Sequence, residues 1–220
     1  MKIKDGRARS PGAPGTCAKT KASAIRPYLL LALFLASCAA PDTQHQIVVS
    51  TRDQKLALLD RGNLMAVYPV STSKFGLGDR PGSRFTPLGK LQIAEKIGDN
   101  APPGTVFKDR RRTGEVVLAN SPGRDPIVTR ILWLRGLEGQ NANAFTRDIY
   151  IHGTPEEWRI GSAASYGCVR MRSTDIIQLY NIVGVGAAVT IVDTSLVSAV
   201  PAMISAHSMG SENTAPFVMR

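Results

Sequence analysis

The sequence has few aromatic residues, only 6% of 220, and no long hydrophobic run. Its main apolar run, residues 28–35, is much shorter than the roughly 20 residues that a membrane-spanning helix needs. A multi-span membrane protein is therefore excluded. Hydrophobic residues make up 43% of the chain, which excludes a disordered protein, and 20 glycines are too few for collagen. What remains is one compact domain with short appendages.

Acidic residues are also in the minority, with 17 Asp and Glu against 27 Lys and Arg, for a formal net charge of +10. Residues 1–37 hold seven cations and one anion and so account for +6 of this charge. The remaining 20 cations and 16 anions leave the rest of the chain at only +4. This mildly basic remainder gives little support to a nucleic-acid partner.

Residues 1–37 have the pattern of an export signal, with a cationic stretch followed by the apolar run 28–35 and small residues. The sequence Leu35-Ala36-Ser37-Cys38 resembles a bacterial lipobox, in which cleavage precedes the cysteine and its thiol is acylated. We therefore expect a lipoprotein signal peptide and an exported, periplasmic protein anchored to a membrane through Cys38. Ordinary cleavage without lipid remains the alternative. The two residues after Cys38 are Ala39 and Ala40 and not aspartate, which slightly favours the outer membrane over retention at the inner one.

The chain contains three cysteines, and an odd number argues against a disulfide framework in an exported protein. Cys17 lies in the predicted leader, and Cys38 would carry the lipid. Cys168 is then left as the free thiol of the mature domain. An unpaired thiol in an oxidising compartment calls for a chemical explanation.

Hydrophobic alternation and turn residues after residue 45 predict a mainly β fold. We expect strands at residues 46–50, 55–59, 64–70, 90–97, 127–134, 148–151 and 187–192, with a further hairpin over 105–119. A helix is expected at about 174–183, with Ser173 or Thr174 as its N-cap and Asp175 in its first turn. Residues 38–45 read as a tether. Residues 194–220 lack clear periodicity and read as a tail.

The residues that suggest chemistry lie between positions 150 and 171. An unperturbed cysteine thiol has a pKa near 8.5, so a nucleophilic Cys168 needs a nearby imidazole or positive group. His152 ends a predicted strand, and the following loop is long enough to bring Cys168 beside it. Amides near Gly167 and Cys168 are candidate oxyanion donors, and Arg170 is a candidate to bind a carboxylate or to lower the thiol pKa. Taken singly, each residue also fits an ordinary structural role.

Taken together, these residues resemble the signature of the L,D-transpeptidase catalytic domain, also called the YkuD domain. The matching segments are His152-Gly153-Thr154, Ile160-Gly161, Ser165-Tyr166-Gly167-Cys168 and Val169-Arg170-Met171. Upstream, Phe85-Thr86-Pro87-Leu88-Gly89 resembles the Thr-Pro-x-Gly turn of the same family. The resemblance covers residues 46–193, which we take as the catalytic domain.

The resemblance implies a β-sandwich with one short helix after the catalytic cysteine, and a cysteine enzyme acting on peptidoglycan stem peptides. Cys168 would attack the carbonyl before a terminal D-amino acid, and His152 would act as the base. The pocket would be shaped by Gly153, Thr154, Ser165, Tyr166, Gly167 and Arg170. An amine would resolve the thioester in crosslinking, water in L,D-carboxypeptidase trimming, and a lipoprotein lysine in anchoring. No metal or organic cofactor is required.

Tyr166 departs from the family pattern, in which a second histidine usually precedes Gly-Cys. A phenol cannot supply the positive charge of an imidazolium, so we expect a higher thiol pKa than in a histidine-bearing relative. Two alternatives to the transpeptidase stay open. One is a catalytically silent peptidoglycan-binding lipoprotein, suggested by Tyr166, and the other is a sortase-like cysteine transpeptidase, in which His, Cys and Arg are far more widely separated.

Overall fold

The computed structural model describes residues 40–201 of the chain. The predicted signal peptide, Cys17, Cys38 and residues 202–220 of the predicted tail lie outside the described residues. Within residues 40–201 none of the helices is long and apolar enough to cross a membrane.

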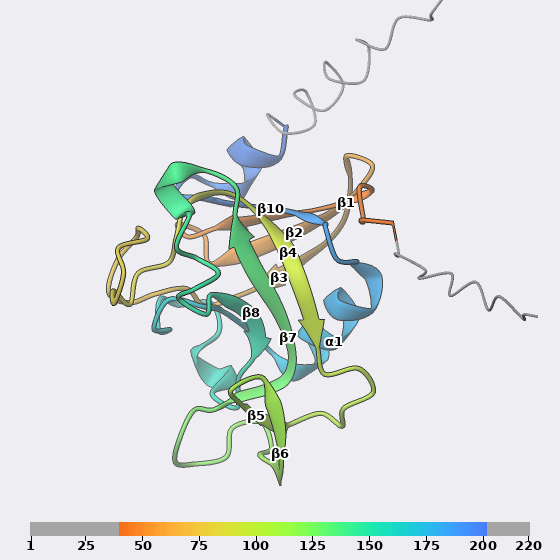
Figure 1. Ribbon diagram of the computed structural model, residues 1–220, viewed down its shortest axis with the longest axis vertical. Coiled ribbons are helices and arrows are strands. Elements are labelled where there is room, and N and C mark those ends of the chain that lie inside the picture. The colour runs from red at the N-terminus through yellow and green to blue at the C-terminus, as the bar shows by residue number, and fades with distance from the viewer. Residues whose placement is uncertain (1–39, 202–220) are drawn as a thin grey trace, which may run out of the picture. The chain divides into compact units, whose positions relative to one another are not determined.

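The described part of the chain is mainly β, as predicted, with a short helix after Cys168 (Figure 1). The strands are β1 (His45–Ser50), β2 (Lys55–Asp60), β3 (Asn63–Pro69), β4 (Gly89–Ile97), β5 (Thr105–Lys108), β6 (Arg111–Val116), β7 (Ile127–Gly136), β8 (Tyr150–Gly153), β9 (Val169–Met171) and β10 (Ala188–Val192). The helix is α1 (Ser173–Ile182), and two short 3-10 turns cover Gly139–Asn141 and Glu157–Arg159. The predicted strands are thus present, although β8 starts two residues later than expected and β9 was not predicted.

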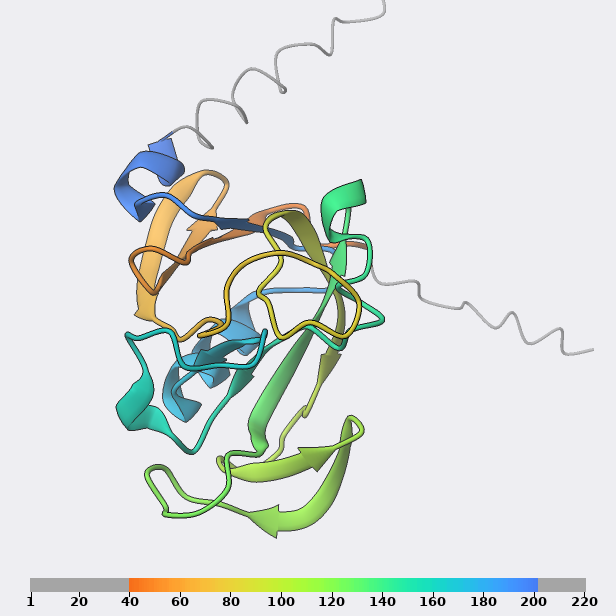
Figure 2. The same ribbon diagram turned by 90° about the vertical axis from the view of Figure 1, so that its left-hand side faces the viewer.

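The strands join into one hydrogen-bonded sheet in the order β3-β2-β1-β10-β4-β7-β5-β6, with β8 paired to β7 and β9 paired to β8. The β1–β10 and β8–β9 pairs are parallel, and the other pairs are antiparallel. Figures 1 and 2 place the β2–β3 hairpin at one end of the domain and the β5–β6 hairpin at the other. The residues of the candidate site, on β8 and β9, lie between these ends.

Helix α1 packs its apolar face against the sheet. Ile176, Leu179 and Tyr180 are buried, which is the i, i+3, i+4 spacing of one helical face, and they join the main core with residues of β7 and β8. Asp175 lies in the first turn, as predicted, where the helix dipole favours a carboxylate. The predicted N-cap was wrong. Arg172 occupies that position, and the Glu157 carboxylate accepts the free Ser173 amide instead, at 2.8 Å.

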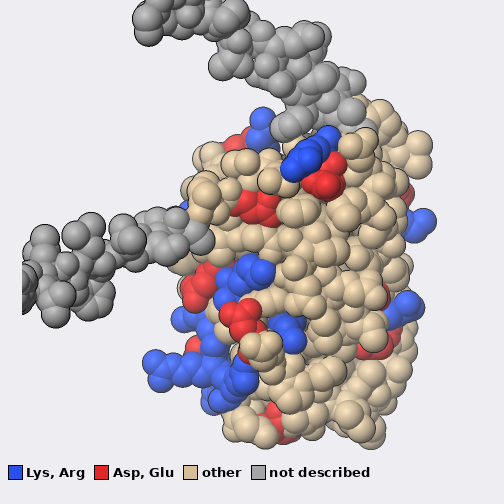
Figure 3. Space-filling model, turned by 90° about the vertical axis from the view of Figure 1, so that its right-hand side faces the viewer, with Lys and Arg blue, Asp and Glu red and all other residues tan. Residues whose placement is uncertain are grey.

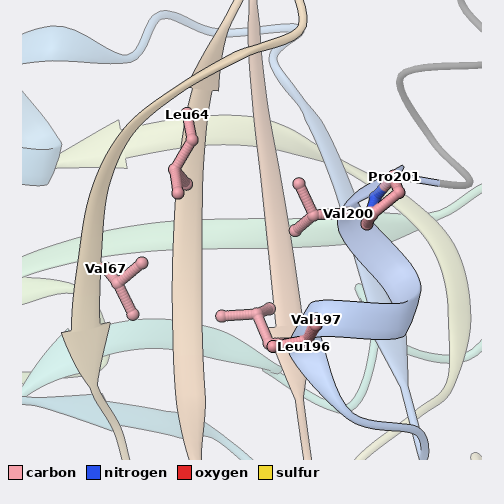
Figure 4. Close-up of a pocket in the computed structure, with 6 residues that line it drawn as sticks. All are labelled: Leu64, Val67, Leu196, Val197, Val200 and Pro201. Carbon is pink, nitrogen blue, oxygen red and sulfur yellow. The ribbon is translucent and has the colours of Figure 1, made fainter.

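The predicted tail is not wholly irregular, because residues 196–201 are helical. Leu196 and Ala199 are buried against Val48, Ala57 and Leu59 on the outer face of the sheet. An open apolar groove remains between this segment and β3. Figure 4 shows its lining residues, Leu64, Val67, Leu196, Val197, Val200 and Pro201.

The predicted tether also contacts the domain. The Asp42 amide donates to the Val185 carbonyl at 2.8 Å, and its carboxylate accepts the Gly184 amide at 2.6 Å. The same carboxylate lies 2.8 Å from the His45 imidazole. These contacts fix the chain from Asp42 onward.

On the face shown in Figure 3, Lys and Arg side chains gather along one edge with Asp and Glu side chains among them.

Candidate active site

Strands β8 and β9 bring the predicted site residues together. Their parallel register pairs His152 with Arg170. Because side chains alternate along a strand, Cys168, two residues before Arg170, faces the same side. A pocket of about 200 Å³ opens there. It is lined by Asp125, Ile127, His152, Tyr166, Cys168 and Arg170.

The Cys168 thiol is held by two backbone groups. Its Sγ accepts the Tyr150 amide at 3.4 Å and donates to the Asp148 carbonyl at 3.4 Å. Burial raises the pKa of Cys168 to about 11, although the Tyr150 amide and the Arg170 charge draw it down. The Arg170 charge lowers the thiol pKa, as expected from the sequence, but the effect of burial is larger and in the opposite direction. The resting side chain at neutral pH is therefore a neutral thiol.

His152 is buried and has a fixed tautomer. Its Nδ1 lies 2.8 Å from the Gly153 carbonyl oxygen, which can only accept, so Nδ1 carries the hydrogen and Nε2 is left as the basic nitrogen. Burial lowers the pKa of His152 to about 4, and the charge of Arg170 acts in the same direction. The imidazole is therefore neutral at pH 7 and able to accept a proton.

Arg170 forms part of the pocket wall but already has anionic partners. It makes a buried ion pair with Asp125 and a longer contact of 3.5 Å with Glu156. The second oxygen of Asp125 accepts the Thr154 hydroxyl at 2.5 Å. The charge of Arg170 is thus largely offset inside the protein, which reduces its capacity to bind a substrate carboxylate, the role expected from the sequence.

Gly153 and Thr154 lie behind the pocket and do not line it. A Cβ on Gly153 would come within 2.6 Å of the Val128 carbonyl oxygen, so only glycine fits there. Thr154 is fully buried and holds Asp125. Gly153 and Thr154 therefore support His152 and Arg170 from behind, and neither of the two lines the pocket itself.

Ser165 and Gly167 shape the turn that carries the thiol. The Ser165 hydroxyl donates to the Cys168 carbonyl at 2.6 Å and accepts the Gly167 amide at 3.2 Å. The Gly167 amide, which the sequence offered as an oxyanion donor, thus already has a partner within the turn. Gly167 has φ +125°, and Thr86 donates to its carbonyl at 3.0 Å. The residue also sets the backbone before Cys168.

Tyr166 lies at the mouth of the pocket, with 53% of its surface exposed. Its ring packs against Phe75, with centroids 5.3 Å apart. The tyrosine therefore does not fill the core, and it contributes an open wall beside the thiol.

Sequence reasoning missed Asp125, although this residue connects Thr154 to Arg170 and lines the pocket. It comes from the loop between β6 and β7, where no motif or periodicity marks it. The backbone groups of Asp148 and Tyr150 that bind the thiol were likewise without a sequence signal. Among residues 40–201, His, Cys, Asp and Glu side chains do not form a group of three suited to a metal ion.

Comparison with known proteins identifies the class. The family model of the L,D-transpeptidase catalytic domain, YkuD, matches residues 44–191. This match covers more than half of the chain and includes His152 and Cys168. The chain belongs to the YkuD family of L,D-transpeptidase catalytic domains.

Individual relatives agree with this assignment. The chain is 30% identical over 160 residues to the probable L,D-transpeptidase YbiS of Escherichia coli strain K12, covering 70% of this chain and 46% of that protein. It is 27% identical over 148 residues to the putative L,D-transpeptidase YqjB of Bacillus subtilis strain 168, covering 67% and 70%. The chain thus spans about half the length of the Escherichia coli relative.

Solved structures are more distant. An L,D-transpeptidase from Mycobacterium tuberculosis H37Rv is 17% identical, with a TM-score of 0.45, over 68% of this chain and 57% of that one. The Enterococcus faecium L,D-transpeptidase C442S mutant is 15% identical, with a TM-score of 0.45, over 68% and 50%.

Proposed function

We propose that this protein is a cysteine L,D-transpeptidase that acts on peptidoglycan stem peptides through a thioester on Cys168. The observation that carries the proposal is the pairing of β8 with β9. It places a thiol and a neutral imidazole of fixed tautomer on one face of the sheet, in one pocket.

The first half-reaction forms the thioester. As the Cys168 sulfur attacks the carbonyl carbon before the terminal D-amino acid, its proton passes to Nε2 of His152. A high thiol pKa and a low imidazole pKa make a resting ion pair unfavourable, so proton transfer accompanies the attack. The carbon–nitrogen bond then breaks, and the imidazolium returns the proton to the departing amine. The Cys168 amide is our candidate donor to the oxyanion.

The second half-reaction releases the enzyme. The amine of an acceptor stem peptide attacks the thioester carbon and gives its proton to His152. The carbon–sulfur bond breaks, and the sulfur recovers its proton from the imidazolium. Water in place of the amine gives L,D-carboxypeptidase activity, and a lipoprotein lysine gives anchoring. No step calls for a metal or an organic cofactor.

The proposal is tested by incubating the protein with purified peptidoglycan fragments and analysing the products by mass spectrometry. We expect loss of the terminal D-amino acid from the donor, with crosslinked or hydrolysed products. The Cys168→Ala variant should produce neither. Binding of the fragments without any change in their mass would instead support the silent peptidoglycan-binding lipoprotein.

We also propose that the protein is exported and anchored to a membrane by acylation of Cys38. The support is the apolar run 28–35 and the lipobox-like sequence that ends at Cys38. Stable anchoring requires acyl chains, because a single short apolar segment that is cleaved leaves none in the membrane. In cells, Cys38→Ser should leave the protein soluble or unprocessed. A cleaved Cys38→Ser protein that stays in the membrane fraction would contradict the lipid anchor.

A further inference from the structure

An exposed pair of aromatic rings carries two cations beside the candidate active site. Phe75 and Tyr166 are 41% and 53% exposed, and their planes are tilted by 44°. The Lys74 ammonium lies 4.9 Å from the centroid of Tyr166 and 5.3 Å from that of Phe75. The Arg84 guanidinium lies 5.2 Å and 5.4 Å from the same two centroids. We call these four residues the aromatic platform.

The backbone fixes the aromatic platform to the turn that carries the thiol. Ser73 forms a parallel bridge with Ser165, and the Lys74 amide donates to the Ser165 carbonyl at 3.2 Å. The Ser73 hydroxyl donates to the Arg84 carbonyl at 2.5 Å, which closes the loop between them. The Thr86 hydroxyl receives the Ser73 amide at 3.0 Å and donates to the Gly167 carbonyl at 3.0 Å. The backbone that carries the platform residues is therefore tied to the turn before Cys168.

The charges of the aromatic platform are not neutralised by the protein. Arg170 nearby is offset by Asp125 and Glu156. By contrast, Lys74 and Arg84 have no carboxylate within ion-pair distance among residues 40–201. Two exposed cations held over the same rings make a site that is positive and partly apolar, which suits a carboxylate attached to a short apolar group.

The aromatic platform borders the pocket that holds the thiol. Tyr166 lines the same pocket as Cys168. An extended peptide advances about 3.3–3.6 Å per residue. A carboxylate one or two residues from the attacked carbonyl lies about 3–7 Å further along such a peptide, which is on the scale of one pocket wall. The Tyr166 ring in that wall has the Lys74 and Arg84 cations 4.9 Å and 5.2 Å from its centroid.

We propose that the aromatic platform binds a stem-peptide carboxylate that lies within two residues of the reacting bond. This inference rests on the proposed transpeptidase function and adds a specificity site to it. Two carboxylates have the required chemistry: the terminal carboxylate of the donor peptide, on the leaving D-amino acid, and the carboxylate beside the reacting amine of the acceptor peptide.

The test compares the wild-type protein with Lys74→Gln/Arg84→Gln, which removes both charges. The control Arg52→Gln/Lys108→Gln removes two exposed cations elsewhere, on the β1–β2 turn and at the end of β5. Each protein is assayed with a donor tetrapeptide that ends in D-alanine or in D-alanine amide. A second arm uses acceptor peptides whose carboxylate beside the amine is free or amidated. The measurement is kcat/KM, with kcat and KM resolved, at low and high salt.

We expect the wild-type protein and the control to prefer the free carboxylate by about tenfold in at least one arm, mainly through KM. The arm that shows the preference identifies which carboxylate is bound. Lys74→Gln/Arg84→Gln should lose the preference, because the free and the amidated peptide then meet the same uncharged side chains. High salt should reduce the wild-type preference, because screening weakens exposed charge pairs.

Three results overturn the inference. The first is a wild-type protein that shows no preference for the free carboxylate in either arm. The second is a Lys74→Gln/Arg84→Gln variant that keeps the wild-type preference. In either case turnover itself persists, and the proposed function stands. The third is a wild-type protein that releases nothing from any peptide, which overturns the proposed function together with the role of the platform.

Discussion

Arg170 and Asp125 form a buried ion pair in the wall of the pocket that holds the Cys168 thiol. The side chain of Arg170 is only 6% exposed and that of Asp125 15%. Removing one member of such a pair leaves the other charge without compensation, which is costly in a poorly solvated site. Each side chain of the pair therefore depends on the other for charge compensation in the pocket wall.

Asp125→Asn should lower the free energy of unfolding by about 2 kcal/mol. The expected loss is smaller than for a fully buried pair, because Glu156 still lies 3.5 Å from Arg170. Urea denaturation of the wild type, Asp125→Asn and the exposed control Asp109→Asn measures it. Equal stability of all three proteins would show that the ion pair contributes nothing to the fold.

His152 makes the stability of the protein depend on pH. Burial lowers the pKa of His152 from 6.5 to about 4, so between these values the unfolded chain binds more protons than the folded one. The free energy of unfolding should therefore decrease as the pH falls from about 6.5 to about 4, by on the order of 3 kcal/mol.

Denaturation curves at several pH values test this dependence. His152→Gln should show a clearly smaller decrease over that range, whereas Cys168→Ala, which keeps the imidazole, should retain the wild-type decrease. If the free energy of unfolding decreased equally with falling pH in His152→Gln and the wild type, a group other than His152 would be responsible for the pH dependence.

His152→Ala should slow acylation of Cys168 by a factor of about 10² to 10⁴, the usual contribution of a general base. The reason is that the thiol, with its pKa raised to about 11, cannot lose its proton to water fast enough at neutral pH. Stopped-flow acylation by a carbapenem measures the rate. Circular dichroism checks that the variant is folded. An unchanged rate would assign the base to another group.

Tyr166→His should move the pH midpoint of Cys168 alkylation by no more than about 0.3 unit, or about 0.4 kcal/mol. An imidazole at this position would lie among Lys74, Arg84 and Arg170, which oppose its protonation. We therefore expect burial, the largest cause of the raised thiol pKa, to outweigh the departure from the family pattern. Iodoacetamide alkylation profiles of the wild type, Tyr166→His and Tyr166→Phe measure the midpoints. A large downward shift in Tyr166→His alone would restore the role expected from the sequence.

Gly167→Ala should destabilise the protein and reduce the reactivity of the thiol. Its φ of +125° disfavours any side chain, and a Cβ would come within 3.2 Å of the Phe85 carbonyl oxygen. Gly114→Ala is the matched control, since Gly114 also has a positive φ but has nothing within 4 Å of its Cβ position. We expect a greater loss of stability for Gly167→Ala, by about 1 kcal/mol or more. Equal losses would show that only backbone strain matters at Gly167.

Sequence patterns predicted the part of the fold that depends on local regularity. The short apolar runs of β1 and β2, the alternation in β10 and the turn residues between strands were sufficient, because these patterns are local properties of the sequence. Strand β9 was missed because it has only three residues, all buried, and thus shows no alternation. The helical segment 196–201 was missed because its buried face depends on packing against β1 and β2.

The candidate site was predictable where a motif fixed both residue types and spacing. His152 and Cys168 were identified in this way and lie in one pocket. The partners of Arg170 and of the Gly167 amide were not predictable, since they come from long-range contacts and from short polar bonds within the turn. The main cause of both pKa shifts was also inaccessible, because it is burial, which the sequence does not report.

The most direct test of the account is the intact mass of the protein during reaction with a stem tetrapeptide donor. A thioester on Cys168 predicts a transient mass increase equal to the mass of the donor minus the mass of the released D-amino acid. The adduct should lie on the proteolytic peptide that contains Cys168, and hydroxylamine should remove it. Cys168→Ala should show no such adduct and release no D-amino acid. Undiminished release of the D-amino acid by Cys168→Ala, or an adduct on another residue, would contradict the account.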